Sequence, residues 1–444
     1  MTFSLLSRPA LRGAALGLGA LLGPLAATAQ NAALDARIAK LAAAEEAKVI
    51  AWRRDLHEHP ELGNEENRTA ALVAAHLKSL GFEVTTGVAR TGVVGILRGG
   101  KPGPVVALRA DMDALPVTEA PGLAYASTVK TTYLGQAVGV MHACGHDTHV
   151  AMLMGAAEVL AQVKKDLPGT VKFIFQPAEE GSVPGTEGGA KLMVKEGVME
   201  NPKVDAVFGL HIASGIEVGN LRYRPEGYYA AADVFQIVVK GKSAHGAAPW
   251  ASVDPVVVAA QIVLGLQTVV SRQTELTKAA AVVTVGKIDG GVRNNIIAEQ
   301  VTMIGTIRTL DKGMQQKIWA DVRRTAEGIA ASAGATAEVS ITPVVPVTYN
   351  DPRLTAQMLP TLRAVAGPTH VQLKEATTGA EDFSYYAEKA PGLFVNLGGL
   401  APGTDPAQVP SHHTAGFKID ESGLELGVKT LATLAADYLA QKHH

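Results

Sequence analysis

The chain has 444 residues, 47% of them hydrophobic, which is more than one domain of typical size needs for its core. Its formal net charge is −2, with acidic and basic residues interspersed, so a basic surface for nucleic acid is not expected. Low aromatic content (5%) and 46 glycines suit an α/β enzyme of two domains.

The first 29 residues have the pattern of a secretory signal peptide. Two arginines precede an apolar run over 14–26, and the small residues Ala27-Thr28-Ala29 follow it as a cleavage site. The alternative is a membrane anchor, for which the run is short. No later stretch is long and apolar enough to span a bilayer. We therefore expect a periplasmic or secreted protein that does not bind membranes after cleavage.

The next part of the chain alternates helices with strands. The predicted helices are 36–59, 65–80, 147–163 and 186–196, and the predicted strands are 93–97, 104–110, 171–175, 204–210 and 393–397. This alternation predicts an α/β fold with a largely parallel sheet.

The middle of the chain follows a different order. It reads as strand 232–240, helix 254–270, strands 280–286 and 300–308, helix 311–333 and strand 337–342. This β-α-β-β-α-β order is the ferredoxin-like split unit. We therefore expect a smaller α+β domain at 228–340, inserted between two parts of the catalytic domain at 30–227 and 341–444.

Residues 141–149, Met-His-Ala-Cys-Gly-His-Asp-Thr-His, hold three histidines, a thiol and a carboxylate. Neutral imidazole and thiolate are good ligands for zinc and related ions. We expect Asp147 to cap the following helix, which would place Cys144 and His146 in the loop before it, where the helix dipole favours a thiolate. The alternative is a helix cap with incidental polar residues. Cys144 is the one cysteine, so an intrachain disulfide is excluded.

Other predicted strands also end in side chains that bind metals. These are Asp111 and Asp113 after 104–108, Glu179 and Glu180 in Gln-Pro-Ala-Glu-Glu after 171–175, and His211 after 204–210, with His412 and His413 further on. Sites in open α/β sheets gather at the carboxyl ends of strands, so these groups are expected to share one site. Adjacent carboxylates point in different directions, so one can bind metal while the other faces the substrate.

Such a site suits amide hydrolysis, because an amide is a poor electrophile with a poor leaving group. Two divalent ions about 3.5–4 Å apart can hold a hydroxide that attacks a polarised carbonyl carbon. A nearby carboxylate can take a proton and pass it to the departing nitrogen.

Four further motifs accompany these groups. They are Arg-Ala-Asp-Met-Asp-Ala-Leu-Pro at 109–116, Gly-Lys-Ser-Ala-His at 241–245, Gly-Thr-Ile-Arg at 305–308 and Gly-Ala-Glu-Asp-Phe at 379–383. With them, residues 40 to 440 resemble the metal-dependent amidohydrolases and carboxypeptidases that include aminoacylases, hippurate hydrolases and plant auxin-conjugate (IAA-amino acid) hydrolases.

The resemblance implies a role for each candidate residue. The metal ligands would be Cys144 (bridging), His146, Glu180, His211 and His413, with His413 preferred to His412 because it stands four residues before Phe417. Glu179 would be the general base, and Asp113 would orient a ligand imidazole. From the inserted lid and dimerisation domain, His245 would stabilise the oxyanion, either within its own chain or across a dimer interface, and Asn295 and Arg308 would hold the substrate.

The resemblance also implies two divalent ions per subunit, zinc or manganese first, with nickel or cobalt as further options. The substrate would be an N-acyl amino acid, and the protein a homodimer or higher homo-oligomer. A dipeptidase or carboxypeptidase acting on small peptides is the nearest alternative. A cysteine hydrolase using Cys144 and a non-catalytic metal-stabilised binding protein are more distant ones. The acyl group and the native metal stay open.

Overall fold

The computed structural model describes residues 22–182 and 185–441. The first described element is helix α1 (Leu22–Glu58), and most of the predicted signal peptide lies outside the described residues. The signal peptide therefore stays a prediction.

The larger body is built on a mixed sheet of eight strands, in the order β1-β2-β6-β3-β7-β18-β8-β17. The strands are β1 (Glu83–Val88), β2 (Gly92–Arg98), β3 (Lys101–Asp111), β6 (Pro168–Gln176), β7 (Ala206–Glu217), β8 (Leu221–Tyr223), β17 (Val371–Leu373) and β18 (Gly392–Leu400). The central neighbours β6, β3, β7 and β18 are parallel, whereas β1, β2 and β8 join antiparallel. The sheet confirms the predicted α/β class.

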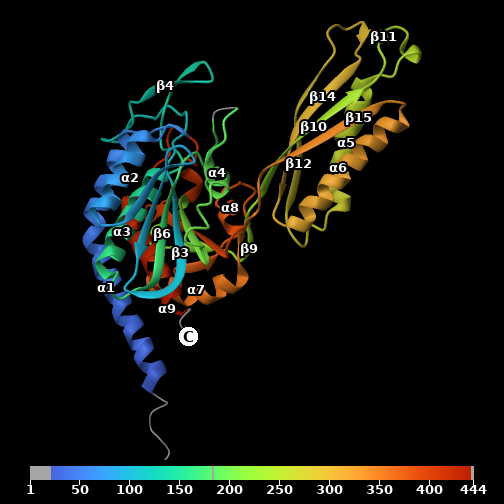
Figure 1. Ribbon diagram of the computed structural model, residues 1–444. Coiled ribbons are helices and arrows are strands. Elements are labelled where there is room, and N and C mark those ends of the chain that lie inside the picture. Colours follow the sequence, from blue (N-terminus) through green and yellow to red (C-terminus); the bar gives the residue numbers. More distant parts are fainter. Residues whose placement is uncertain (1–21, 183–184, 442–444) are drawn as a thin grey trace, which may run out of the picture.

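Helices cover both faces of this sheet (Figure 1). One face carries α1, α2 (Asn67–Ser79), α3 (His146–Val163), α7 (Pro352–Ala366) and α9 (Leu424–Gln441), and the other carries α4 (Gly189–Lys195) and α8 (Ser384–Ala387). Neighbouring strand residues point into different cores, as Phe208 does into the first and Val207 into the second. The sheet is therefore buried on both sides, as parallel sheets require.

A second sheet of four strands forms a separate body, which we call the small domain, and the larger body is the large domain (Figure 1). Its order is β12 (Ala281–Gly290), β14 (Gln300–Thr309), β10 (Ala231–Lys240) and β15 (Thr336–Val345), and all neighbours are antiparallel. Helices α5 (Pro255–Gln273) and α6 (Lys312–Ser332) pack on the sheet and form its core. This is the predicted ferredoxin-like arrangement.

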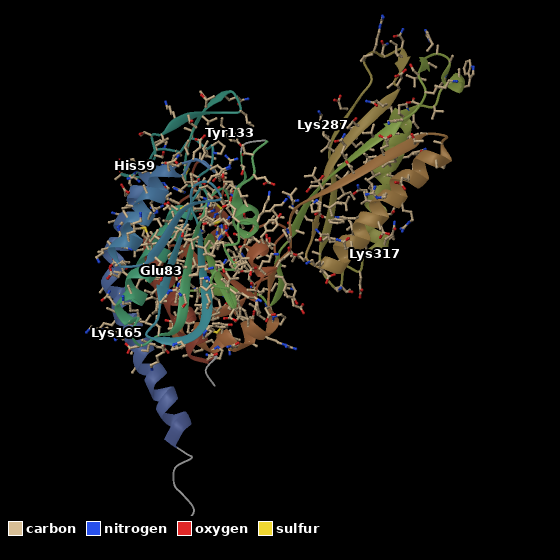
Figure 2. All side chains as sticks on the ribbon, in the orientation of Figure 1. His59, Glu83, Tyr133, Lys165, Lys287 and Lys317 are labelled. Carbon is tan, nitrogen blue, oxygen red and sulfur yellow. The ribbon has the colours of Figure 1, made fainter. Side chains whose placement is uncertain are left out.

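Short elements complete the chain. They are β4 (Lys130–Tyr133), β5 (Gln136–Gly139), β9 (Glu226–Tyr229), β11 (Ala244–His245), β13 (Ile296–Ile297), β16 (Thr348–Asn350) and the 3₁₀ turns η1 (Pro249–Ala251), η2 (Pro406–Gln408) and η3 (Glu421–Gly423). Strands β9 and β16 pair where the chain enters and leaves the small domain. Side chains of the two domains form separate groups, with Lys287 and Lys317 on the small one (Figure 2).

Two expectations about the strands need correction. Strand β15 runs to Val345 rather than 342, because it is an edge strand, where the missing N–H of Pro343 leaves no partner unsatisfied. Strand β7 does not end at His211 but continues to Glu217 beside β18. The predicted domain limits themselves stay predictions.

The expectation that no stretch after the signal peptide is long and apolar enough to span a bilayer is also wrong, because helix α5 is long and apolar enough by length and composition. Helix α5 has a mean hydropathy of 1.4 over its most apolar window. Its residues Val258, Ile262, Leu266 and Val269 are buried in the core of the small domain. Packing of these residues against the sheet of the small domain accounts for the apolar composition of the buried face of α5. At its start, Asp254 caps the helix by accepting a hydrogen bond from N of Val256 (2.9 Å).

Candidate active site

The five predicted metal ligands lie together at one end of the large sheet. Their atoms fall into four overlapping groups, in each of which all ligand atoms lie within 4.8 Å of one another. The groups are Cys144, His211 and His412; Cys144, Glu180 and His413; His146, Glu179 and Glu180; and Asp111, His146 and His149. Shared members make the cluster continuous, as two neighbouring divalent ions require.

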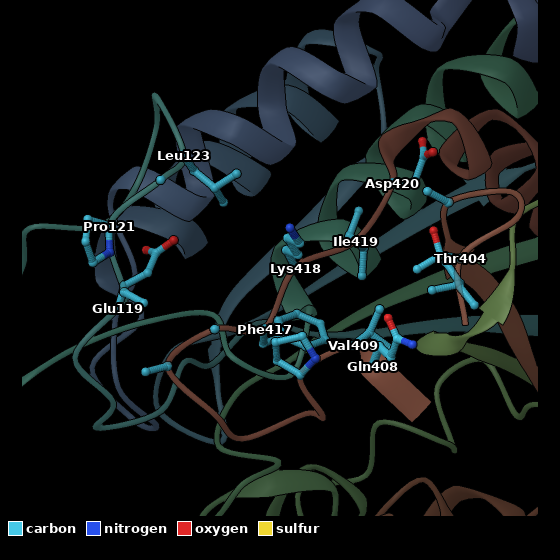
Figure 3. Close-up of a pocket in the computed structure, with 18 residues that line it drawn as sticks. Glu119, Pro121, Leu123, Thr404, Gln408, Val409, Phe417, Lys418, Ile419 and Asp420 are labelled. Atoms are coloured by element: carbon cyan, nitrogen blue, oxygen red, sulfur yellow. The ribbon is translucent and has the colours of Figure 1, made fainter. Parts of the chain in front are cut away.

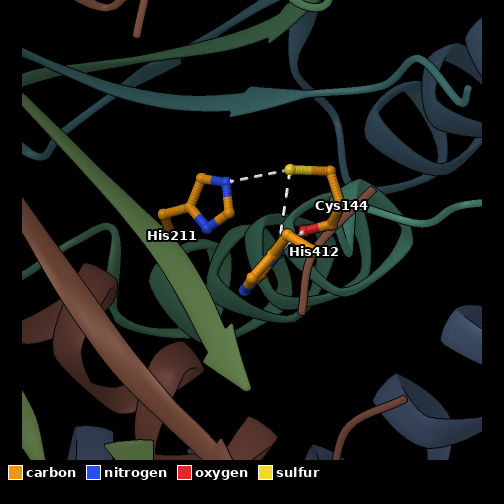
Figure 4. A group of neighbouring side chains, drawn as sticks. All are labelled: Cys144, His211 and His412. Carbon is orange, nitrogen blue, oxygen red and sulfur yellow. Dashed lines mark hydrogen bonds between the residues drawn. The ribbon is translucent and has the colours of Figure 1, made fainter. Parts of the chain in front are cut away.

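The Cys144 thiol lies between two imidazoles. Its Sγ is 3.4 Å from Nε2 of His211 and 3.3 Å from Nε2 of His413; Figure 4 shows it with His211 and His412. The backbone N of His413 donates to O of Ala143 (2.9 Å), which ties the C-terminal loop to the loop before α3. This central position is the one that a bridging ligand needs.

The imidazole of His146 shows most directly that the cluster fits a cation. Its Nδ1 is 3.2 Å from Oδ1 of Asp113, whose other oxygen accepts from N of Glu180 (2.9 Å). Its Nε2 is buried without a hydrogen-bond partner, although carboxylates of Asp111, Glu179 and Glu180 lie 3.7 to 4.0 Å away. A nitrogen aimed at oxygens beyond hydrogen-bond distance is the arrangement expected around a shared metal ion.

Charge in this region points the same way. The buried guanidinium of Arg109 pairs with Asp111 (2.8 Å), Glu381 (3.0 Å) and Asp382 (2.9 Å). Glu179 and Glu180 form no ion pair with Arg109. Among the described residues, this region therefore holds more carboxylate groups than Arg109 neutralises, and divalent cations would neutralise the excess negative charge.

The two adjacent glutamates have different environments. Burial and the charges of Glu381 and Glu180 raise the pKa of Glu179 well above its usual range. Burial also favours protonation of Glu180, but its contacts with His413 (Oε1 to Nε2, 3.0 Å) and His146 lower its pKa. Glu180 is therefore suited to bind metal and Glu179 to carry a proton, because carboxyl groups with separated pKa values divide such roles.

The same surroundings argue against a cysteine nucleophile. Burial and the carboxylates of Glu180 and Glu179 raise the pKa of Cys144 well above its usual range. A reactive cysteine needs the opposite, a partly exposed and electropositive setting. A thiolate at this position requires cations beside it.

Two histidines near the cluster have other partners. The ring of His412 approaches O of Cys144 with Nδ1 (3.2 Å) and accepts from N of Ser214 with Nε2 (3.3 Å). His149 has Nδ1 2.5 Å from Asp111 and accepts from N of Ile212 with Nε2 (2.8 Å). Both nitrogens of each ring are thus used, which supports His413 rather than His412 as a ligand. Sequence reasoning placed Asp111 among the groups expected to share the site, but it assigned no role to His149, Glu381 or Asp382, although each lies in a quoted motif.

The prediction that Asp147 caps helix α3 is wrong. The helix begins at His146, and its N-cap is Gly145 in the left-handed region (φ 91°). Asp147 instead points into the protein, where its carboxylate lies 2.9 Å from Nε of Arg53 and 2.8 Å from Nδ1 of His57, both on α1. These ion pairs fix the first turn of α3, and with it His146, on the side that faces α1.

The predicted substrate residues of the small domain do not join the cluster within one chain. His245 is exposed on β11, at the end of the small domain farthest from the large domain (Figure 1). Asn295 lies beside it, since its O accepts from N of Gly246 (2.8 Å). Arg308 is near the other end of the domain, on β14, and donates to Oγ1 of Thr306 (2.5 Å).

Two cavities lie near these groups. An open pocket of about 480 Å³ includes Glu179, Glu180 and Tyr385 and so opens onto the cluster. A cavity of about 640 Å³ lies between residues 119–123 and the 399–420 segment and is lined in part by Phe417, whose ring is tilted by 43° to that of His412 (centroids 4.6 Å apart) (Figure 3). Because the second cavity includes none of the predicted ligands, we place the reaction at the first.

A mixed, mostly parallel sheet that gathers a thiol, imidazoles and paired carboxyl groups at one end defines a metal-dependent hydrolase. The chain belongs to Peptidase family M20/M25/M40, which matches residues 107–437. Thermostable carboxypeptidase 2 of Saccharolobus solfataricus is 42% identical over 88% of this chain and 95% of the relative. N-acetylcysteine deacetylase of Bacillus subtilis is 40% identical over 87% of this chain and 96% of the relative. IAA-amino acid hydrolase ILR1-like 2 of Arabidopsis thaliana is 39% identical over 90% of this chain and 88% of the relative.

A solved structure agrees with these relatives. The YXEP protein of Bacillus subtilis, described as a dinuclear metal-binding peptidase of the M20 family, has a TM-score of 0.74 and 36% identity, over 89% of this chain and 99% of that one. The predicted class, a hydrolase dependent on two divalent metal ions, is confirmed.

Proposed function

We propose that the chain hydrolyses the amide bond of N-acyl amino acids, using Glu179 as the general base. The observation that carries the proposal is the Glu179 carboxyl group, which lies beside the ligand cluster, is 11% exposed and has a raised pKa. A purely structural metal site needs no such group. Relatives named as an N-acetylcysteine deacetylase and an IAA-amino acid hydrolase support this substrate class.

The residues of the chain divide the work. Two ions held by Cys144, His146, Glu180, His211 and His413 would polarise the amide carbonyl and would lower the pKa of a water molecule toward neutral pH. Glu179 accepts the proton of that water on its carboxylate and delivers it to the departing nitrogen, so that no amide anion leaves. Asp113 fixes the ring of His146 through Nδ1 and the turn at Glu180 through N, so the ligands stay in place.

The test replaces Glu179 by glutamine, which keeps the size but cannot accept the proton. We expect two metal ions per chain to be retained and kcat to fall by about 10²- to 10⁴-fold. Glu200→Gln, an exposed carboxyl after α4, is the matched control and should keep both metal and activity. Full activity of Glu179→Gln would refute the base assignment.

Hydrolysis of small peptides is a second candidate, because one relative is named a carboxypeptidase. A panel of N-acetyl, N-benzoyl and N-indoleacetyl amino acids and dipeptides, run with zinc, manganese, nickel or cobalt, separates the two. We expect the N-acyl compounds to have the higher kcat/KM, and zinc or manganese to support the reaction. A preference for dipeptides would assign the second function.

We further propose a homodimer in which His245 and Asn295, at the far end of the small domain, act on the partner's active site, while Arg308 at its other end holds the substrate. The position of His245 far from the cluster in its own chain supports this, and so do exposed apolar residues of the small domain such as Val257 and Leu264. Coexpressing Glu179→Gln with His245→Ala should restore activity, because a mixed dimer then contains one complete site. Failure to restore it in a confirmed mixed dimer would contradict action across the interface.

Export to the periplasm or medium is proposed from the N-terminal pattern alone. Fractionation and N-terminal sequencing of the mature protein should give a first residue near Gln30. A cytoplasmic protein that keeps residues 1–29 would contradict the proposal.

A further inference from the structure

A row of paired residues crosses the large sheet from the metal cluster to its edge. His211 on β7 pairs with Asn396 on β18, Asn396 pairs with Arg222 on β8, and Arg222 pairs with Gln372 on the edge strand β17. Paired residues of neighbouring strands lie on the same face, and so does Lys374, two positions after Gln372. The row therefore ends in two cationic side chains at an open edge.

Neither cation has an acidic partner. In the described part of the chain, no carboxylate lies within ion-pair distance of Arg222 or Lys374, and Nη1 of Arg222 is buried without a hydrogen-bond partner. Nζ of Lys374 donates to Oδ1 of Asn396 (2.9 Å), a neutral amide. Burial and the nearby charge of Arg222 lower the pKa of Lys374. The two charges repel each other, and an anion between them would remove that cost.

An open pocket of about 650 Å³ lies over these two side chains. Gln372, Thr377 and Thr378 also line it and can donate further hydrogen bonds. Its acidic member, Glu375, is exposed and forms no ion pair with either cation. The pocket therefore combines a positive charge with neutral donors, which is the composition of an oxyanion site.

We propose that Arg222 and Lys374 form a binding site for a small oxyanion, a carboxylate or phosphate group, at the β8–β17 edge of the large domain. The planar guanidinium suits two oxygens of one ligand, and the ammonium adds a third donor. The site stands independently of the proposed amidohydrolase function.

This pocket is distinct from the active site. Arg222 is two strands away from His211, which is about 10 Å at the usual strand spacing. Buried Asn396 lies between them, and its amide donates to the hydroxyl of Tyr229 (2.7 Å) while its oxygen accepts from the hydroxyl of Tyr228. The lining of this pocket includes none of the predicted metal ligands.

The test must report on this pocket alone, because phosphate also binds metal ions. Acetylation of Lys374 in the metal-loaded protein can be followed by peptide mass spectrometry, in phosphate, glutarate or chloride at equal ionic strength. We expect phosphate or glutarate to slow acetylation of Lys374 about tenfold, and the effect to saturate with anion concentration. The reason is that the charge-assisted contact between the anion and the ammonium group must be lost before the amine can react. Lys101, exposed at the start of β3, is the internal control and should react equally in all three salts.

The variant Arg222→Gln should abolish the protection while the rate at Lys101 stays unchanged, and Arg222→Lys should retain part of it. Protection by phosphate alone would identify a phosphate site, and protection by both anions a general carboxylate and phosphate site. Equal acetylation in all three salts, or protection that survives in Arg222→Gln, would overturn the proposal. Equal acetylation in the three salts is measured on the wild-type protein, so that outcome does not depend on whether a variant folds.

Discussion

The buried ion pairs behind helix α3 make stability depend on pH in a way that can be worked out from His57. Its Nδ1 lies 2.8 Å from Asp147 and its Nε2 lies 3.1 Å from Glu119. Burial alone would lower the pKa of His57, but these two carboxylates raise it to about 9, from an ordinary value of 6.5. At about 1.4 kcal/mol per pH unit, the protonated ring contributes about 3 kcal/mol to the free energy of unfolding.

The sign follows from which state holds the proton. Below pH 6.5 both states are protonated, and the contribution is fully present. Between pH 6.5 and 9 the folded protein keeps a proton that the unfolded chain loses, so the free energy of unfolding falls as pH rises. Above the folded pKa the contribution is gone.

The perturbation is His57→Gln, which removes the titrating ring. Urea unfolding at several pH values, with a chelator present so that metal affinity does not contribute, gives the free energy of unfolding of each protein. Between pH 6 and 9.5 the wild type should lose about 3 kcal/mol more than the variant. His59→Gln, which removes an exposed imidazole two residues further on, should behave as the wild type. Equal pH slopes for His57→Gln and wild type would refute the ion-pair reasoning.

Three further predictions concern the metal ligands and the small domain. His413→Ala should bind fewer than two metal ions per chain by elemental analysis, whereas His412→Ala should keep both; the reverse result would exchange the two assignments. Asp113→Asn should weaken metal affinity about 10- to 100-fold in a chelator competition, because it no longer fixes the ligand imidazole; unchanged affinity would remove that role. Gly305→Ala should destabilise the protein by about 1–3 kcal/mol in urea, since its Cβ would lie 2.2 Å from a buried phenylalanine ring. Gly286→Ala, with 3.8 Å to its nearest atom, should cost less, and equal losses would argue against the clash.

Local patterns determined the elements of this protein. Apolar periodicity sets the helices and strands, and Asp254 could be predicted as a helix cap because its hydrogen bond reaches only two residues along the chain. The position of ligands after strands was also predictable, since parallel strands bring their carboxyl ends to one edge. Asp111 at the end of β3 and Glu180 after β6 both approach His146 for this reason.

Only the tertiary structure could decide contacts between distant segments. Asp147 reads as a helix cap, and it is instead an ion-pair partner because Arg53, 94 positions earlier, packs beside it. The distance of His245 from the cluster depends on how one domain sits on another, which no local spacing encodes. Sequence spacing fixes what a residue can do with its near neighbours, whereas burial and charge partners, which set pKa values and choose between His412 and His413, exist only after the chain has folded.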